Sequence, residues 1–257
     1  MISPQAVVSP KAKIGKNVRI MPFVYIEDDV EIGDDCFLYP GVNLMRGTRL
    51  GKNNTIHQNT VISARPQDFH YQGENTLCII GDNNIIRENV VINRATYTTG
   101  ETRIGNGNFI MEGVHLSHDV HMGDENVLGY GVKVAGNVEI GNYTIFSSGV
   151  IANSDVRIGD AVMIQSGTRF AKDIPPYIVA GGYPVAYEGL NTYVLEQLNV
   201  DKKIQSHIAN AYRLVFHGQD ALVNVCNQIE QQIQAGAEIN SIVEFLKSSK
   251  LGLISKM

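Results

Sequence analysis

Aliphatic residues recur through the first two thirds of the chain at intervals that are multiples of six. The clearest positions are aliphatic-glycine pairs, most of them eighteen residues apart: Ile14-Gly15, Ile32-Gly33, Leu50-Gly51, Ile80-Gly81, Ile104-Gly105, Met122-Gly123, Ile140-Gly141 and Ile158-Gly159. Sixth positions between them are mostly Ile, Leu or Val, and a small or β-branched residue usually lies two positions earlier. Two inward residues in every six predict a short strand followed by a turn.

A six-residue unit is too short for a strand and a helix, so three units must wrap into one triangular coil. Stacked coils would pair strand on strand at about 4.8 Å and bury the aliphatic columns along the axis. Gly, Asn and Asp after each aliphatic residue are expected to supply the corner conformations. The alternative is a β-sandwich with chance periodicity, which so many in-phase matches disfavour.

Two polar segments interrupt the repeat and are predicted to be loops that project from corners of the coil. They span 63–76 (SARPQDFHYQGENT) and 95–103 (ATYTTGETR). Loops of this length are often functional.

After Phe170 the hexameric pattern ends in a Pro/Gly segment, and helical spacing begins near Asn191. We therefore predict two domains, a parallel β-helix over 1–190 and an α-helical domain over 191–257.

Composition and charge exclude several classes of protein. The 257 residues carry a net charge of -5, without the concentrated basic surface that a nucleic-acid binder needs. No window approaches the roughly 18 apolar residues of a membrane span, so we expect a cytoplasmic protein. The widely spaced Cys36, Cys78 and Cys226 fit buried thiols in a reducing compartment better than disulfides or a zinc site.

Four segments carry motifs more specific than the repeat: PQDFHYQGE, IGDNNIIRENVVINRAT, FIMEGVHLSHDVHMGDENV and KDIPPYIVAGGYP. With them the chain resembles, from end to end, the UDP-N-acetylglucosamine O-acyltransferases of lipid A synthesis. The arithmetic of the repeat leaves the hand of the coil open, and the resemblance implies a left-handed one. The expected fold class is thus an all-β solenoid, a left-handed parallel β-helix of hexapeptide repeats with a C-terminal α-helical domain.

The resemblance also implies an activity. Such enzymes move a 3-hydroxyacyl chain from acyl-carrier protein to the 3-hydroxyl of UDP-N-acetylglucosamine, in clefts between subunits of a homotrimer and with no metal or dissociable cofactor. A sugar hydroxyl is a poor nucleophile, so a base that titrates near neutrality is needed, and His118 matches the family's base. Asp119 would orient its ring, and the backbone amide of Gly136 in VAGNV matches the family's oxyanion donor.

Further residues match the family's substrate contacts. Gln67 and Asp68 correspond to residues that hold the glucosamine and the hydroxyl of the acyl chain, and His115 corresponds to a second histidine of the cleft. Ser166 matches the position where the acyl chain ends, and Asn191 matches a nucleotide contact.

The chain departs from the family pattern at several of these places. Asn93, Asn137 and Asn153 stand where the family has histidines. Gln197 and Leu198 replace an arginine pair expected near phosphate or carrier, and glutamine does not imitate a bidentate guanidinium. We expect the amides at Asn137, Asn153 and Gln197 to occupy the substrate contacts of the residues they replace, which predicts retained chemistry with altered recognition.

Simpler explanations exist for each of these residues. A histidine at an outward phase is more often a solvated surface residue, aspartates favour corner turns, and Gly136 could serve its turn. A zinc site at His115, His118 and His121 is disfavoured, because His115 and His121 lie one unit apart and hence on different faces.

Two other functions compete with O-acylation. N-acylation of a related UDP-amino-sugar could use the same base, although such enzymes usually carry an extra N-terminal domain. A non-catalytic trimeric paralogue that binds carrier protein or nucleotide is the other alternative. Lys202, Lys203 and Arg213 are candidates for docking an acidic carrier protein, or they form a merely solvated helix face.

Overall fold

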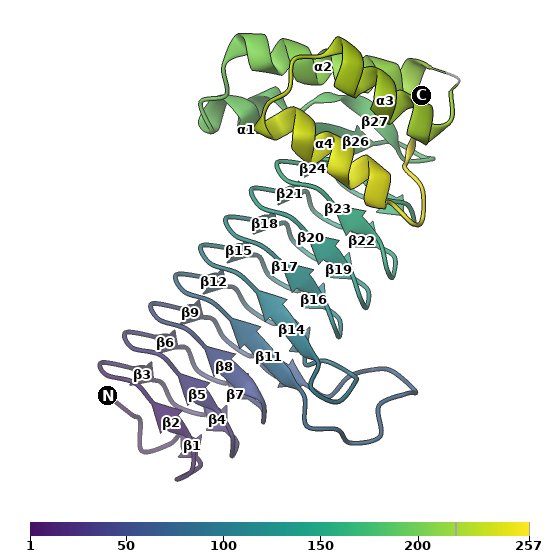
Figure 1. Ribbon diagram of the computed structural model, residues 1–257. Coiled ribbons are helices and arrows are strands. Elements are labelled where there is room, and N and C mark those ends of the chain that lie inside the picture. The colour runs from purple at the N-terminus through teal and green to yellow at the C-terminus, as the bar shows by residue number, and fades with distance from the viewer. Residues whose placement is uncertain (219, 257) are drawn as a thin grey trace.

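Short parallel strands and tight turns alternate through the first 170 residues and build a long triangular coil (Figure 1). The computed structural model describes residues 1–218 and 220–256. Every third strand pairs with the strand one coil away, for example Val7 with Tyr25 and Val8 with Ile26. The predicted parallel β-helix is confirmed, and its hand is left.

Three sheets form the three faces of the coil, and each is named here after its first strand. The β1 sheet contains β1 (Val7–Val8), β4 (Tyr25–Ile26), β7 (Asn43–Leu44), β10 (Val61–Ala64), β13 (Val91–Asn93), β16 (His115–Leu116), β19 (Lys133–Val134), β22 (Ile151–Ala152) and β25 (Arg169–Phe170). The β2 sheet contains β2 (Lys13–Ile14), β5 (Glu31–Ile32), β8 (Thr48–Leu50), β11 (Leu77–Ile80), β14 (Glu101–Ile104), β17 (His121–Met122), β20 (Glu139–Ile140) and β23 (Arg157–Ile158). The β3 sheet contains β3 (Arg19–Ile20), β6 (Phe37–Leu38), β9 (Thr55–Ile56), β12 (Ile85–Ile86), β15 (Phe109–Ile110), β18 (Val127–Leu128), β21 (Ile145–Phe146), β24 (Met163–Ile164), β26 (Ile178–Gly181), β27 (Ala186–Leu190) and β28 (Ser255–Lys256).

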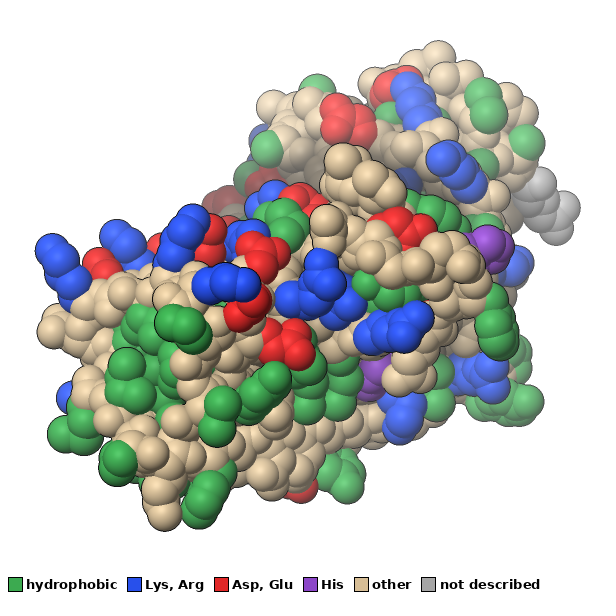
Figure 2. Space-filling view, turned by 90° about the horizontal axis from the view of Figure 1, so that it is seen from below, with side chains coloured by type: hydrophobic (Ala, Val, Ile, Leu, Met, Phe, Trp, Pro, Cys, Tyr) green, Lys and Arg blue, Asp and Glu red, His purple; other side chains and the backbone are tan. Residues whose placement is uncertain are grey.

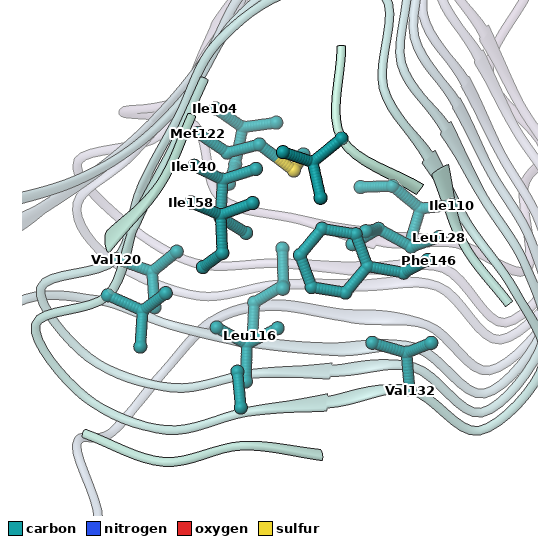
Figure 3. Close-up of a cluster of buried hydrophobic side chains, with 14 of the residues drawn as sticks. Ile104, Ile110, Leu116, Val120, Met122, Leu128, Val132, Ile140, Phe146 and Ile158 are labelled. Carbon is teal, nitrogen blue, oxygen red and sulfur yellow. The ribbon is translucent and has the colours of Figure 1, made fainter. Parts of the chain in front are cut away.

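The aliphatic columns predicted from the repeat line the axis of the coil. Figure 3 shows Ile104, Met122, Ile140 and Ile158 stacked from one sheet, facing the columns of the other two. Phe146, an aromatic residue at one of the sixth positions that are mostly Ile, Leu or Val, has no exposed surface and fills the same core. Successive coils thus bury one continuous apolar column.

The glycines that follow the aliphatic residues have a different role from the one expected. Gly33 is typical: its φ lies outside the left-handed region, and a Cβ atom there would lie 2.6 Å from the backbone carbon of Gly51 in the next coil. Instead Asn and Asp two residues further along, such as Asp35 (φ 59°) and Asn53 (φ 55°), adopt the left-handed corner conformation. The expectation holds for Asn, Asp and corner glycines such as Gly107 (φ 66°), but it was wrong for the glycine of each aliphatic-glycine pair, which is required by the close approach of coils.

A column of buried asparagines, missed by the hydrophobic pattern, also faces the axis. Asn54, Asn84, Asn108 and Asn126 are each at most 1% exposed. The Oδ1 atom of each accepts the backbone amide of the next member at 2.9 Å, and Asn126 accepts Thr144 at 2.8 Å. Stacking therefore satisfies the Oδ1 atom of each member, whereas Nδ2 of Asn126 has no partner in the described structure.

We expect Asn108→Ala to lower the free energy of unfolding by about 1 to 3 kcal/mol, because the buried backbone amide of Asn126 would lose its acceptor and the Oδ1 of Asn84 would keep only the backbone amide of residue 108. Urea unfolding followed by circular dichroism measures this. The matched control is Asn240→Ala on an exposed helical position, with a change of roughly 0.5 kcal/mol or less. Equal effects at the two sites would contradict the role of the column.

Both predicted loops leave the same corner, where strands of the β1 sheet lead into the β2 sheet (Figure 1). The first loop is shorter than 63–76, because β10 extends to Ala64. The second ends before 103, because β14 begins at Glu101 and the inward Thr102 pairs with Cys78. The loops are defined below as the first loop (65–76) and the second loop (94–100).

In the part of the chain that the structure describes, four helices cover the C-terminal end of the coil: α1 (Thr192–Gln197), α2 (Lys202–His217), α3 (Leu222–Gln232) and α4 (Ala237–Ser248) (Figure 1). Helix α2 packs on β27, where Tyr187 stacks on Phe216 with ring centroids 4.6 Å apart. The sequence pattern did not predict β28, which returns the C-terminal segment to the β3 sheet beside β27. Gln219 and Met257, which fall within the predicted domain 191–257, lie outside the described residues.

Candidate active site

His118 lies between two carboxylates at the corner that bears both loops. Its Nδ1 atom is 2.8 Å from Oδ2 of Asp119, and its Nε2 atom is 3.4 Å from Oδ2 of Asp68. The imidazole is 12% exposed, so the ring is largely covered by its own chain. The expected pairing with Asp119 is present, whereas the contact with Asp68, fifty residues earlier, was not anticipated.

Asp119 is held from both sides of its turn. Its backbone is left-handed, with φ at 59°, and its amide donates to the hydroxyl of Thr102 at 2.9 Å. The amide of Thr96, in the second loop, donates to the Asp119 carboxylate at 3.1 and 3.3 Å. Neither threonine was predicted, although the inward phase of Thr102 is visible two residues before Ile104.

Asp68 is turned toward His118 by the fold of the first loop. The amide of His70 donates to its Oδ1 at 2.7 Å, and Nδ1 of His70 lies 2.8 Å from the same oxygen. These two hydrogen bonds, the backbone one first, lower the pKa of Asp68 and favour the carboxylate. Gln67 precedes it with an exposed side chain, and Phe69 follows fully exposed.

Gly136 lies one coil above His118 and touches its ring. A Cβ atom at Gly136 would be 2.4 Å from Cε1 and 2.7 Å from Nε2 of His118. In the part of the chain that the structure describes, its amide donates no backbone hydrogen bond. Both observations fit an oxyanion donor beside the base, and the close contact explains why no side chain is tolerated here.

We expect Gly136→Ala to lower kcat roughly 10-fold to 100-fold, because the added methyl group must displace the imidazole from its present position. Steady-state kinetics against the wild type measure the loss. Gly131→Ala is a steric control, since nothing lies within 4 Å of a Cβ atom there, although its positive φ adds a small strain. An undiminished kcat in Gly136→Ala would contradict the close packing of base and glycine.

His115 lies on β16, three residues before the base, and is half-buried. Burial first, and then the cation of Lys133 on the neighbouring strand, lower the pKa of His115. A lowered pKa leaves this imidazole uncharged at neutral pH. It is thus suited to hydrogen bonding with a neutral group of a substrate.

The amides that replace family histidines lie at different depths. Asn137 is exposed and donates to Asp155 at 3.1 Å, and half-buried Asn153 accepts from Arg169 at 3.3 Å. Both belong to the His118 corner, one and two coils further along. Asn93 is fully buried under the first loop, where its amide donates to the carbonyl of Arg65 at 2.7 Å.

The remaining predicted contacts lie away from His118. Ser166 is exposed at another corner, between β24 and β25, and Gln197 is exposed at the end of α1. Asn191 is 1% exposed: its Oδ1 caps α1, and its Nδ2 donates to the carbonyl of Ala161 at 2.8 Å. Both ends of the Asn191 side chain thus bond within the fold, and its nucleotide contact stays a prediction.

His115 belongs to the β1 sheet and His121 to the β2 sheet, on separate faces as expected. Over residues 1–218 and 220–256, no three His, Cys, Asp or Glu side chains are grouped in a way that could hold a metal ion. In the same ranges, no helix has the length and hydropathy needed to cross a membrane. Cys36, Cys78 and Cys226 are buried and free, and burial raises the pKa of Cys78 to about 12.

Comparison with known proteins gives consistent matches over most of the chain. Residues 173–254 match the family model described as UDP N-acetylglucosamine O-acyltransferase, domain 2, and residues 11–44, 29–64 and 101–136 match the bacterial transferase hexapeptide model. An acyl-[acyl-carrier-protein]--UDP-N-acetylglucosamine O-acyltransferase of Chlorobaculum parvum is 50% identical over 80% of this chain and 78% of its own length. The enzyme of that name from Psychromonas ingrahamii is 47% identical over 85% and 84%.

Solved structures agree with these sequence matches. A UDP-N-acetylglucosamine acyltransferase from Bacteroides fragilis superposes with a TM-score of 0.96 at 44% identity, covering 99% of this chain and 100% of the other. The enzyme from Francisella novicida gives a TM-score of 0.96 at 31% identity, covering 100% and 94%. The likeness therefore includes both the coil and the helical cap.

Proposed function

The chain belongs to the acyl-[acyl-carrier-protein]--UDP-N-acetylglucosamine O-acyltransferase family, and we propose that His118 is the general base of its reaction. The protein is an acyltransferase that takes its acyl group from acyl-carrier protein and delivers it to UDP-N-acetylglucosamine. The proposal for His118 is carried by one observation: a nearly buried imidazole has a carboxylate 2.8 Å from Nδ1 and its Nε2 directed at the loop residue Asp68.

The geometry supports a balanced sequence of steps. Nε2 of His118 takes the proton of the sugar hydroxyl while the hydroxyl oxygen forms a bond to the thioester carbonyl carbon. Asp119 stabilises the imidazolium that results, and the Gly136 amide donates to the oxyanion. Collapse of the intermediate breaks the carbon–sulfur bond, and the thiol of the carrier leaves with the proton held by His118.

The substrate contacts remain proposals. Gln67, Asp68 and His115 lie on the elements around the base, and we propose that they orient the glucosamine and a hydroxyl on the acyl chain. Ser166, Asn137, Asn153 and Gln197 are assigned on the resemblance alone. For Asn191, a structural role is favoured over a direct contact. We further propose that the acceptor is the 3-hydroxyl, that the donor is a 3-hydroxyacyl chain, and that the product enters lipid A synthesis.

The direct experiment is acyl transfer by the purified protein, with radiolabelled UDP-N-acetylglucosamine and a panel of hydroxyacyl carrier proteins. An ester-linked product identified by mass spectrometry is the expected result. An amide-linked product from an amino-sugar acceptor would favour N-acylation, and binding without turnover across the panel would favour a non-catalytic paralogue.

We propose that the working form is a homotrimer. Large apolar side chains are exposed near the N-terminal end of the coil, where Figure 2 shows hydrophobic side chains gathered. They include Ile2, Val7, Phe23 and Tyr25, which are 52, 61, 68 and 40% exposed. Exposed apolar patches of this kind are typical of protein interfaces. Light scattering should give a mass of three times 28.2 kDa, and a monomer at assay concentration would reject the proposal.

Helix α2 carries the candidate docking residues for the acidic carrier. Lys202, Lys203 and Arg213 are all exposed, and Lys202 is 2.5 Å from Glu196. We propose that they raise the rate of encounter with the carrier. Reversing the charge of Lys203 and Arg213 should raise the apparent KM for acyl carrier without changing kcat, and an unchanged KM would indicate a merely solvated face. The cytoplasmic location stays a prediction.

A further inference from the structure

Arg94 is a buried cation at the start of the second loop. Its residue is 7% exposed, and among residues 1–218 and 220–256 no carboxylate forms an ion pair with it. Its guanidinium donates instead to the carbonyl of Ser63 at 2.9 Å and to the hydroxyl of Tyr71 at 2.8 Å. Burying a cation is unfavourable unless its hydrogen bonds are made, so these two contacts hold Arg94 in one place.

Tyr71 anchors the first loop to the coil. It is 7% exposed, whereas Phe69, two residues earlier, is fully exposed at the tip. The Tyr71 hydroxyl accepts from Arg94 and donates to the carbonyl of Glu74 at 3.1 Å, and the Arg94 guanidinium carbon is 5.4 Å from the ring centroid. Tyr71 therefore fixes the polar first loop through two contacts with Arg94, a cation–π contact and a hydrogen bond.

The anchor is linked to the site by the backbone. The amide of Tyr71 donates to the carbonyl of Asp68 at 3.2 Å, which closes the turn that carries Asp68. The other end of the loop is tied to the same strand end, because the Arg94 amide donates to the carbonyl of Ala64 at 3.0 Å. Asp68 therefore lies between two attachments that both depend on the position of Arg94.

We propose that Arg94 is a positioning residue, which acts through Tyr71 to place the Asp68 carboxylate 3.4 Å from Nε2 of His118. Within residues 1–218 and 220–256, its guanidinium donates to Ser63 and Tyr71 and to neither His118 nor Asp68, so its contribution is transmitted by the loop. The inference rests on the proposed function, because it assigns a structural cause to the position of Asp68 beside the base.

A double-mutant cycle tests this chain of contacts. Arg94→Met keeps most of the side-chain volume and should lower kcat roughly 10-fold to 100-fold, the range expected for a displaced active-site group. In an Asp68→Asn background the same change should have almost no further effect, because the group that Arg94 positions has already been altered. Tyr71→Phe, which removes only the hydroxyl, should give a smaller loss of kcat that also disappears in that background.

Arg157→Met is the matched control for loss of a partly buried arginine. Arg157 lies 4.6 Å from the Phe245 ring and bonds to Ser248, so its loss tests general destabilisation at a place remote from the first loop. Its effect on kcat should be the same in wild-type and Asp68→Asn backgrounds. NMR of the His118 imidazole provides a second readout: Arg94→Met and Asp68→Asn should shift its ring signals alike, and Arg157→Met should not.

The inference is overturned if the kcat losses of Arg94→Met and Asp68→Asn multiply in the double variant. It is also overturned if Arg94→Met leaves the NMR signals of the His118 ring unshifted. Should Arg94→Met not fold, Tyr71→Phe answers the same question by the same cycle. If His118→Ala retains transfer, the proposed function fails instead, which separates the two outcomes.

Discussion

His118→Ala is expected to reduce kcat for acyl transfer by roughly 100-fold to 10,000-fold, the usual contribution of a general base. The reason is positional: Nε2 is the basic atom directed at the loop residue Asp68, and the methyl group of alanine cannot accept a proton. Alanine also leaves the space beside Gly136 empty, which gives the substrate slightly more room. We therefore expect KM to stay within a few-fold of the wild-type value.

Single-turnover assays with radiolabelled UDP-N-acetylglucosamine measure this loss directly. His121→Ala is the matched control, because His121 is an exposed histidine on the adjacent β17 and lies on a different face of the coil. Transfer at the wild-type rate by His118→Ala would remove His118 from the role of base. A similar loss in both variants would point to an effect on folding.

Asp119→Asn is expected to lower kcat by about 100-fold or more, because the carboxylate supports the imidazolium formed during transfer. Asparagine tolerates the left-handed conformation of this position, so the turn should survive. The amide can still accept from Thr96 or from Nδ1 of His118, but it carries no charge to stabilise the protonated ring. The loss should therefore appear in kcat, with little change in KM.

Asp35→Asn is the control for Asp119→Asn, since Asp35 has the same left-handed φ of 59° at a corner far from the loops. Melting temperatures of both variants should stay close to that of the wild type. A kcat for Asp119→Asn equal to that of Asp35→Asn would show that the charge beside His118 has no part in the reaction.

Most of the architecture could be predicted from the sequence. Most coils take eighteen residues, so side chains that stack along the axis recur at that interval in the sequence. Ile104, Met122 and Ile140 form one such column. The helices of the cap were visible in the same way, from 3.6-residue spacing. The candidate catalytic pair His118 and Asp119 could be proposed because the two residues are adjacent in a specific motif.

The buried asparagine column could not be predicted from the pattern of hydrophobic and polar residues. Asn54, Asn84 and Asn108 are polar and would be assigned to the surface one at a time. Only the stacking of coils shows that each Oδ1 atom accepts the backbone amide of the next member, which offsets part of the cost of burial. Asn191 is a similar case, since only the packing shows that its side chain caps α1 and bonds to the carbonyl of Ala161.

The sequence by itself determined the repeat, the faces of the coil and the helical cap, because each follows from local period, and a motif of neighbouring residues indicated His118 as the candidate base. The tertiary structure alone decided that Asp68 meets His118, that Gly136 touches the ring, and that Arg94 holds the first loop through Tyr71. The physical reason is that loops have no side-chain period. The distance between residues fifty positions apart depends on how coils stack and on which buried groups anchor the loop.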